Sequence, residues 1–435
     1  MLTQSLPRQE GQPHYCKPFV HSIHKLVHKI GEQFSATLIN KSLNLHTVKY
    51  YSHLNTAVSI LEMYKGQAPF THFLRTFFSQ RRKYGSRDRK QIAQLCYSFF
   101  RLGKAGQGLL PEDRILMAYF LCADHSDELL QFLKPAWHEF SSMKPENKLL
   151  ALHTPFGVTD IFPWKDELSE GIDHHDFCQS FLIQPSLFLR IRPGKEKAVL
   201  LKLSGAAIPF NQPMANCVEL PNATNIEELL DTNKEVVVQD YSRQLVSRLM
   251  NKGKDLPAPV SIWDCCAASG GKSILALDTL GNVELTVSDI RESILSNLKK
   301  RFSEAGITNY KSFVANLQSK FTSPKSKFDL VIADVPCTGS GTWSRTPEQL
   351  YYFSTDRIRE YVTKQDKITS AVIPYIKPRG YLLYITCSVF RQENEDRVND
   401  LVSRFPLNLI EMQLIKGYDK KADTLFSALL QLKTA

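Results

Sequence analysis

The sequence predicts an α/β fold: a seven-stranded, mostly parallel sheet in the C-terminal half, preceded by a small α/β module and a helical N-terminal domain. Two observations carry this prediction. From Pro259 onward, short apolar runs alternate with helical patterns, which is typical of a parallel sheet covered on both faces. Between residues 50 and 150, the apolar residues recur at helical spacing instead. The 435 residues suffice for two or three domains.

The N-terminal region divides into a tail and a helical domain. Residues 1–47 lack periodicity and are predicted to be a tail, and a translation start further downstream is an alternative. Residues 48–150 are predicted to form the helical domain. Ser86 is expected to cap one of its helices, and Pro111 to open the next.

The remaining chain divides into three parts. Residues 151–184, rich in acidic and aromatic side chains, are predicted to be a connector, and 185–238 a small α/β module. Residues 239–435 are predicted to form the catalytic domain. Its expected strands are 260–264, 284–288, 311–315, 328–333, 380–386, 408–414 and 424–431, and its expected helices 271–280, 291–305, 356–376 and 393–404.

Positive charge is concentrated near the N-terminus. Residues 1–110 hold 16 Lys and Arg against 4 Asp and Glu, an excess of 12, whereas the remaining 325 residues hold 38 against 40. The densest basic segment consists of Arg81, Arg82, Lys83, Arg87, Arg89 and Lys90. Such a segment can neutralise phosphates, so we predict that it binds nucleic acid. The alternative is a solvated helix face.

Composition excludes several classes of protein. No apolar run approaches the ~18 residues of a membrane span, so no membrane contact is expected. The nine cysteines show no CxxC spacing, which disfavours a zinc site and a disulfide framework and favours a reducing compartment. His174 and His175 have no second ligand cluster at metal spacing and are predicted to lie on the surface. We therefore expect a cytoplasmic, metal-free protein, and a monomer.

Polar and small residues follow the predicted strands, where ligands of parallel sheets bind. The first such segment runs Asp264-Cys-Cys-Ala-Ala-Ser-Gly-Gly-Lys272, in which two glycines let the backbone pass beneath a ligand. Its spacing matches neither GxGxxG nor the phosphate loop, which disfavours a dinucleotide or a triphosphate. Asp289 ends the next strand, about 20 residues later, and can accept both hydroxyls of a ribose. Helix capping is the alternative role for this carboxylate.

Two cysteines also follow apolar strands. Cys337 stands in Asp334-Val-Pro-Cys337, and Cys387 in Thr386-Cys-Ser388. A nucleoside-cofactor site that ends in two cysteines indicates chemistry in which one thiolate bonds covalently and a second thiol assists, as in methylation of a pyrimidine carbon. On the residues alone, either cysteine fits the nucleophile. Burial as a small apolar side chain is the structural alternative.

Together these segments resemble a known family. The two cysteine motifs, the glycine turn and Glu393-Asn394-Glu395 are similar to signatures of the Sun/Fmu (RsmB-like) RNA cytosine-C5 methyltransferases, as is the segment 239–244. The resemblance covers about 185–435, and residues 70–104 resemble more weakly the NusB-like domain of bacterial members. Two positions depart from the family pattern: Ser269 replaces Pro, and Asn316 stands where an acidic residue is common.

The resemblance implies a Rossmann-like class I methyltransferase core with S-adenosylmethionine as cofactor. Its binding residues would be Cys266, Ala267, Ala268, Ser269, Gly270, Gly271, Lys272, Asp289, Asn316 and Asp334. It implies further that Cys387 attacks carbon 6 of cytosine, that Cys337 assists product release, and that Asp334 contacts ring nitrogen 3. The implied partner is RNA, and the basic helical domain favours ribosomal RNA over transfer RNA.

Other function classes stay open at this stage. A methyltransferase for DNA, or for a different ring atom, would be expected to lack either the second cysteine or the basic helical domain. A non-catalytic RNA-binding assembly factor would be expected to have lost a motif. Cys337, Cys387, Asp334, Asp289 and Lys272 are all present, which favours the RNA cytosine-C5 enzyme.

Overall fold

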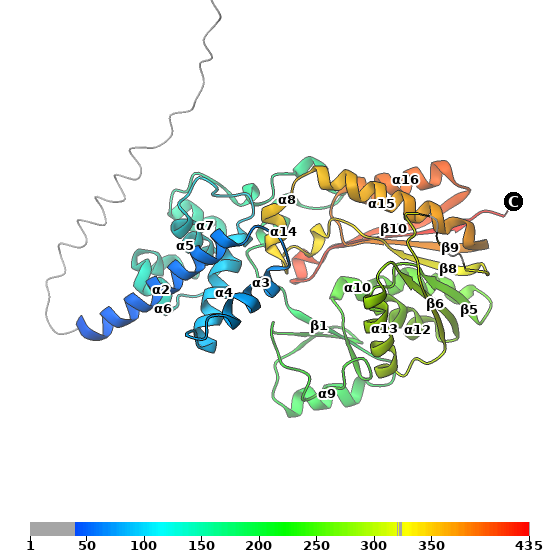
Figure 1. Cartoon of the computed structure of the whole chain (residues 1–435), viewed down its shortest axis with the longest axis horizontal. Helices are drawn as coiled ribbons and strands as arrows, with labels where there is room; N and C mark the ends of the chain where they lie inside the picture. The colour runs from blue at the N-terminus through cyan, green and yellow to red at the C-terminus, as the bar shows by residue number, and fades with distance from the viewer. Residues whose placement is uncertain (1–39, 320, 322–323, 435) are drawn as a thin grey trace, which may run out of the picture. The chain divides into compact units, whose positions relative to one another are not determined.

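The computed structural model describes residues 40–319, 321 and 324–434 (Figure 1). The chain separates into two compact units, 1–52 and 53–435. Of the first unit, the structure describes only the beginning of helix α2 (Asn40–Met63). Of the predicted tail, 1–47, residues 1–39 lie outside the described part of the chain.

The second unit begins with helices. After α2 come α3 (Phe70–Ser79), α4 (Ser86–Arg101), α5 (Pro111–Cys122), α6 (Glu128–Leu133), a 3₁₀ turn (Pro135–Phe140) and α7 (Pro145–Ala151). Helix α4 buries Ile92 and Leu95, as its helical spacing predicts. Pro111 opens α5, as predicted. The expectation that Ser86 caps α4 is wrong: Ser86 is its first residue, and Gly85 takes the cap position, because the Asp88 carboxylate accepts from the Gly85 N–H at 3.2 Å.

The connector region packs against the catalytic part of the chain. It contains the 3₁₀ turns Val158–Ile161 and Lys165–Glu167 and helix α8 (His174–Ser180). One buried apolar cluster combines Leu102 of the helical region, the connector residues Phe162, Phe177 and Phe181, and the catalytic-region residues Trp343, Phe353, Val389 and Phe390. The Ser169 N–H donates to the Val389 carbonyl at 2.8 Å. The connector is therefore part of a core that the helical and catalytic regions share.

Helix α14 (Pro347–Tyr352) makes a second set of contacts with the helical region. The Glu348 carboxylate accepts from the Phe70 N–H at 3.3 Å, at the first residue of α3. The Tyr352 hydroxyl donates to the Tyr64 carbonyl at 2.7 Å, and the Lys104 ammonium donates to the Tyr351 carbonyl at 2.7 Å. Several of these groups are buried, so the contacts fix the helical region to α14.

A small antiparallel sheet follows, with the strand order β2-β3-β1-β4. Its strands are β1 (Leu187–Ile191), β2 (Asn211–Met214), β3 (Cys217–Leu220) and β4 (Val236–Val238), and α9 (Glu196–Gly205) lies between β1 and β2 in the sequence. Short helices α10 (Tyr241–Leu245) and α11 (Ser247–Met250) and the 3₁₀ turn Asn251–Asp255 lead into the large sheet. The domain boundaries proposed from the sequence remain predictions.

The large sheet has seven strands in the order β10-β11-β9-β8-β5-β6-β7, which confirms the predicted fold class. They are β5 (Val260–Asp264), β6 (Val283–Asp289), β7 (Tyr310–Val314), β8 (Phe328–Asp334), β9 (Ile376–Thr386), β10 (Leu407–Ile415) and β11 (Leu425–Leu432). Strands β5 to β9 pair in parallel, and β11 pairs antiparallel with both β9 and β10. The sheet is thus mostly parallel, as predicted.

Helices cover both faces of this sheet, α12 (Gly271–Leu280) and α13 (Glu292–Glu304) on one side, α15 (Asp356–Val372) and α16 (Glu395–Arg404) on the other (Figure 1). Two successive residues of β5 show how each face of the sheet packs against a different pair of helices. Ile262 packs in the cluster that includes α12 and α13, whereas Trp263 packs in the cluster that includes α15 and α16. Strand side chains alternate between faces, so a strand covered on both sides must be apolar throughout.

Two predicted boundaries are wrong. Strand β9 begins at Ile376, four residues before the predicted start, and α15 ends at Val372 instead of 376. Pro374 lies in a 3₁₀ turn, Ile373–Tyr375, because proline cannot continue the helix. Arg379 then has a positive φ of 63°, within the strand that the sequence predicted to start only at 380.

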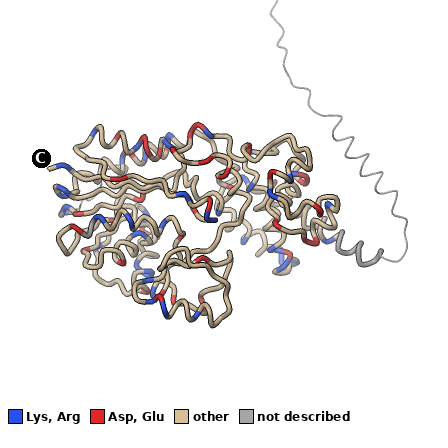
Figure 2. Tube along the Cα trace, turned by 180° about the vertical axis from the view of Figure 1, so that it is seen from behind, with Lys and Arg blue, Asp and Glu red and all other residues tan. Residues whose placement is uncertain are grey.

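No helix in the described part of the chain is both long and apolar enough to cross a membrane. Basic and acidic residues are interspersed along the trace of the α/β region (Figure 2). The cytoplasmic location and the monomeric state remain predictions.

Gly270 should be required for folding of the turn between β5 and α12. Its φ is +82°, and an added Cβ would lie 2.5 Å from the ring of buried Phe302. We expect Gly270→Ala to lower the free energy of unfolding by at least about 1–3 kcal/mol, measured by urea denaturation. Gly271→Ala is the matched control, because a Cβ there meets nothing closer than 3.7 Å. Equal losses in the two variants would contradict this account.

Candidate active site

The turn after β5 is held by the strand beside it. The Ala267 N–H donates to the Ser288 carbonyl at 2.9 Å, and the Ala268 N–H donates to the Asp289 carboxylate at 3.1 Å. Buried Asp264, the last residue of β5, accepts from the Ser273 hydroxyl at 2.6 Å, and burial raises its pKa to about 7. The backbone of this turn is therefore tied to the carboxyl ends of β5 and β6.

A cavity of about 430 Å³ opens at these strand ends. Of the predicted site residues, it is lined by Cys266, Ala268, Lys272, Asp289, Asn316, Asp334 and Cys387. Ala267, Ser269, Gly270, Gly271 and Cys337 are not among its lining residues. The Ser269 hydroxyl instead accepts from the Arg301 guanidinium at 3.1 Å, so this side chain helps to fix the turn.

Sequence reasoning missed part of the lining. Arg243, Ile290, Arg291, Leu317, Tyr361 and Lys364 also face the cavity. Ile290 directly follows Asp289, and Leu317 directly follows Asn316, both of which are predicted ligands. This neighbourhood could have indicated that the two residues line the cavity. Tyr361 and Lys364 belong to α15. The local sequence of this helix does not distinguish residues that face a cavity from residues that face solvent.

Charged groups at the cavity are paired. The Lys272 ammonium lies 2.8 Å from the Asp334 carboxylate, and the Lys272 side chain is only 6% exposed. Asp289 is buried and lies 3.2 Å from the Arg291 guanidinium. Asp289 also accepts from the Arg291 N–H at 3.0 Å, which is a local turn contact. Both Arg291 bonds go to Oδ1, whereas Oδ2 accepts only from the Ala268 N–H, so Oδ2 keeps a lone pair that can accept from a ligand.

The two predicted cysteines are brought together. Their Sγ atoms are 3.3 Å apart, and both thiols are free. The hydrogen bond from the Cys337 thiol and the charge of Arg243 lower the pKa of Cys387, against the opposing effect of burial. The same thiol pair and burial raise the pKa of Cys337. Cys387 is therefore the thiol that ionises first.

A buried carboxylate joins the two cysteine loops. Glu393 accepts from the Thr338 N–H at 2.9 Å and from its hydroxyl at 2.5 Å, one residue after Cys337. It also accepts from the Ser388 hydroxyl at 2.5 Å, one residue after Cys387, and from the Gln365 amide at 2.9 Å. Burial raises the pKa of Glu393, and these four donors oppose that effect. The relative position of the two thiols thus depends on Glu393.

The predicted RNA-binding residues lie in one segment of the helical region. Arg82, Lys83, Arg87 and Lys90 are exposed, whereas Arg81 and Arg89 are partly buried. The Arg81 guanidinium lies 4.0 Å from the centroid of the Phe77 ring, and the Arg89 guanidinium donates to the Tyr84 carbonyl at 2.8 Å. The segment therefore presents four exposed cations and two partly buried ones that contact other protein groups.

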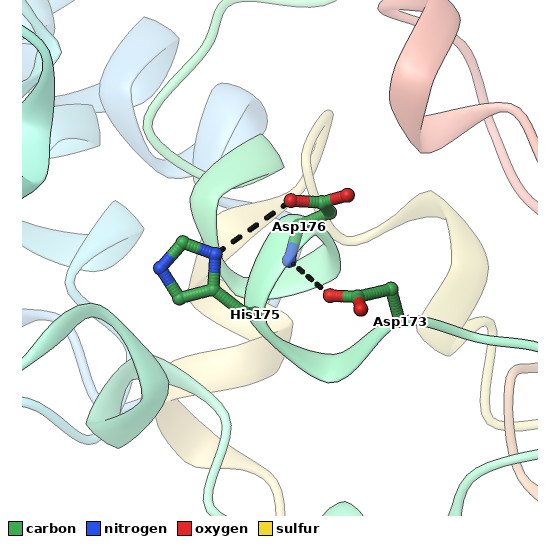
Figure 3. Close-up of side chains that lie close together, drawn as sticks. All are labelled: Asp173, His175 and Asp176. Carbon is green, nitrogen blue, oxygen red and sulfur yellow. Dashed lines mark hydrogen bonds and ion pairs between the residues drawn. The ribbon is translucent and has the colours of Figure 1, made fainter.

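His174 and His175 lie at the start of α8. Exposed Asp173, His175 and Asp176 group together (Figure 3). Asp173 caps the helix by accepting from the Asp176 N–H at 2.9 Å, and His175 lies 3.4 Å from Glu146. Helix capping and surface pairing account for this arrangement. The His174 Nε2 donates to the Phe162 carbonyl at 2.6 Å, and among the described residues His174 belongs to no group of potential metal ligands.

A family of known proteins matches the segment that contains the cavity. Residues 258–426 match the family described as 16S rRNA methyltransferase RsmB/F. This segment is similar to the RsmB/F methyltransferases. It contains the glycine turn, Asp289, Asp334 and both cysteines, so the resemblance read from the motifs is confirmed.

Curated relatives match parts of the chain. A Bacillus subtilis protein named "Probable ribosomal RNA small subunit methyltransferase B" is 27% identical over 277 residues, covering 61% of this chain and 60% of the relative. Ribosomal RNA small subunit methyltransferase B from Proteus mirabilis is 26% identical over 234 residues, covering 51% and 52%. The chain thus spans about half of the length of the curated relatives it matches.

Solved structures share the fold. The crystal structure of PH0851 has a TM-score of 0.61 at 18% identity, over 88% of this chain and 98% of that one. NSun6 from Pyrococcus horikoshii, solved with SFG, has a TM-score of 0.53 at 15% identity, over 60% and 94%. At these identities, the similarity supports the fold.

Loss of the Glu393 charge should destabilise the protein. Glu393→Gln keeps one acceptor oxygen and turns an amide toward the donors, so we expect the free energy of unfolding to fall by at least about 2 kcal/mol in urea denaturation. The control is Asp396→Asn, because Asp396 is only three residues away, in the first turn of α16, and is about half exposed. Unchanged stability of Glu393→Gln would show that the carboxylate does not hold the loops.

Proposed function

We propose that this protein is an S-adenosylmethionine-dependent RNA methyltransferase that methylates carbon 5 of a cytosine in ribosomal RNA. The observation that carries the proposal is the pair of thiols 3.3 Å apart, with Cys387 on a cavity that also holds the Lys272–Asp334 ion pair. The RsmB/F family match of residues 258–426 supports it.

The size and the lining of the cavity support binding of the cofactor. Its volume of about 430 Å³ falls within the range of small-molecule sites. Asp289 would accept from the ribose hydroxyls. Ile290 is 49% exposed beside it and, with Leu317, offers apolar surface for the adenine ring. Asn316 uses its side-chain oxygen for the Gln318 N–H at 3.1 Å, which leaves its amide N–H groups as donors.

The residues divide the reaction into easier steps. S-adenosylmethionine supplies the methyl group. The Cys387 thiolate adds to carbon 6 of cytosine, which moves electron density onto carbon 5 so that this carbon can take the methyl group. Asp334 stabilises the addition at ring nitrogen 3. Loss of the carbon-5 proton then breaks the bond between sulfur and carbon 6, and Cys337 assists this release.

RNA is the proposed partner because the chain carries a basic segment outside the catalytic domain. An enzyme that modifies a base within a large RNA needs contacts beyond the flipped nucleotide. Exposed Arg82, Lys83, Arg87 and Lys90 would contact phosphates. Two curated relatives are named for the small ribosomal subunit RNA, which favours ribosomal RNA over transfer RNA as the substrate.

Incubation with tritiated methyl donor and total RNA, followed by nuclease digestion, tests the function directly. The label should appear as 5-methylcytidine in small-subunit ribosomal RNA and should be absent with Cys387→Ala. Label in transfer RNA would redirect the proposal to another RNA. RNA binding without any label would favour a non-catalytic assembly factor.

Replacement of Cys337 should trap the covalent intermediate. Because Cys387 attacks and Cys337 releases, Cys337→Ala should accumulate a protein–RNA adduct, visible as a slowly migrating band on a denaturing gel. The double variant Cys337→Ala/Cys387→Ala is the control and should give no band. An adduct in the double variant would show that another residue is the attachment point.

Reversal of the basic segment should weaken RNA binding. Replacing Arg82, Lys83 and Arg87 by Glu should lower affinity and reduce the logarithmic salt slope by roughly 0.7–0.9 for each lost contact, measured by filter binding at several salt concentrations. Arg81 is spared because it packs on Phe77.

The matched control replaces three exposed lysines of the catalytic domain, Lys299, Lys300 and Lys327, by Glu. Both triple variants change the net charge by the same amount. Equal losses of affinity in the two would show that the effect is one of total charge and that the basic segment is a solvated helix face.

A further inference from the structure

Arg243 lines the cavity but was not among the site residues predicted from the sequence. It belongs to α10 and lines the cavity together with Cys387 and Asp334. Its Nε lies 3.5 Å from the carboxylate of Asp423, which is buried in the segment before β11. Among the described residues, this is the only ion pair that Arg243 makes.

A chain of buried charges fixes this arginine. Arg345 lies 2.7 Å from Asp423 and 2.7 Å from Asp240. Asp240 in turn accepts from the Asp423 N–H at 3.1 Å and caps α10 by accepting from the Ser242 N–H at 2.9 Å. The first turn of α10, and therefore the backbone of Arg243, is held to the segments that carry Arg345 and Asp423.

Both positive and negative groups lie around Cys387. The groups that act on this thiol are Cys337 after β8, Asp334 at the end of β8, Arg243 on α10 and Asp423 before β11. Asp334 is paired with Lys272 on α12, and Asp423 with Arg345. Arg345 also lies 2.7 Å from Asp240, so the two cations Arg243 and Arg345 face the two carboxylates of Asp240 and Asp423. Of these two cations, Arg243 is the one that lines the cavity together with Cys387.

We propose that Arg243 is a positioning residue that supplies the counter-charge for the Cys387 thiolate, and that Asp423 holds its guanidinium in place. The inference rests on the proposed role of Cys387 as nucleophile. A nearby cation favours the ionised form of a thiol, and the ionised form is the one that attacks. The direction of the Cys387 pKa agrees with this assignment, because Arg243 lowers it.

Site-resolved alkylation tests the proposal without RNA or methyl donor. The full-length protein and its variants are treated with iodoacetamide at a series of pH values, and modification of the Cys387 peptide is followed by mass spectrometry. We expect Arg243→Gln to move the midpoint of the Cys387 profile to higher pH and to slow modification at pH 7 by about tenfold, which corresponds to one pKa unit. Arg243→Lys, which keeps the charge, should stay within about threefold of the parent.

The matched control is Arg291→Gln. Arg291 lines the same cavity but pairs with Asp289, so its removal should leave the Cys387 profile unchanged. A parent-like profile in Arg243→Gln would overturn the proposal. So would an equal shift in Arg243→Gln and Arg243→Lys, because a merely structural role would affect both. Should Arg243→Gln fail to fold, Arg243→Met takes its place with the same expected shift.

A second measurement distinguishes the competing role. If Arg243 binds an RNA phosphate, Arg243→Gln should weaken RNA binding and leave the alkylation profile as in the parent, which refutes the counter-charge. Failure of the proposed function has a separate signature: Cys387→Ala would still methylate RNA, whatever the effect of Arg243 on alkylation.

Discussion

The arrangement of the two thiols depends on one buried carboxylate, that of Glu393. The two thiols lie on loops that leave different strands, β8 and β9, fifty residues apart in the sequence. Glu393 accepts hydrogen bonds from the residue that follows each cysteine and from Gln365 on α15. A buried charge is tolerated only when its hydrogen bonds are made. The hydrogen bonds to this carboxylate therefore hold both loops, and with them both sulfur atoms, in fixed relative positions.

The sheet supplies the second constraint. Asp264, Asp289, Asp334 and Thr386 are the last residues of β5, β6, β8 and β9. Parallel strands end at the same edge, so residues from distant parts of the sequence meet there without any long loop. Two of these carboxylates have different partners. Asp334 pairs with Lys272, whereas Asp289 accepts hydrogen bonds from the backbone N–H groups of Ala268 and Arg291.

Much of this could be predicted from the sequence because apolar strands and their polar ends are local signals. All seven strands of the large sheet were expected, and Asp289, Asp334 and Cys387 were found at the cavity. The start of β9 was missed because Lys377-Pro378-Arg379-Gly380 has the composition of a turn, although the strand accommodates it with a positive φ at Arg379. The contributions of Arg243 and Glu393 could not be predicted, since their partners lie 180 and 55 residues away.

The apolar cluster shared by the helical region, the connector and the C-terminal α/β region has a consequence for the proposed function. Phe162 and Phe177 pack with Trp343 and Phe390, and α14 is bonded to α3, so packing holds the helical region in place. In a rigid arrangement, the span between the basic segment 81–90 and Cys387 is a fixed length. If the basic segment and Cys387 both act on RNA as proposed, the protein selects a cytosine partly by its distance from the stretch of RNA backbone that is bound at the basic segment. This selection does not depend on the bases that neighbour the cytosine.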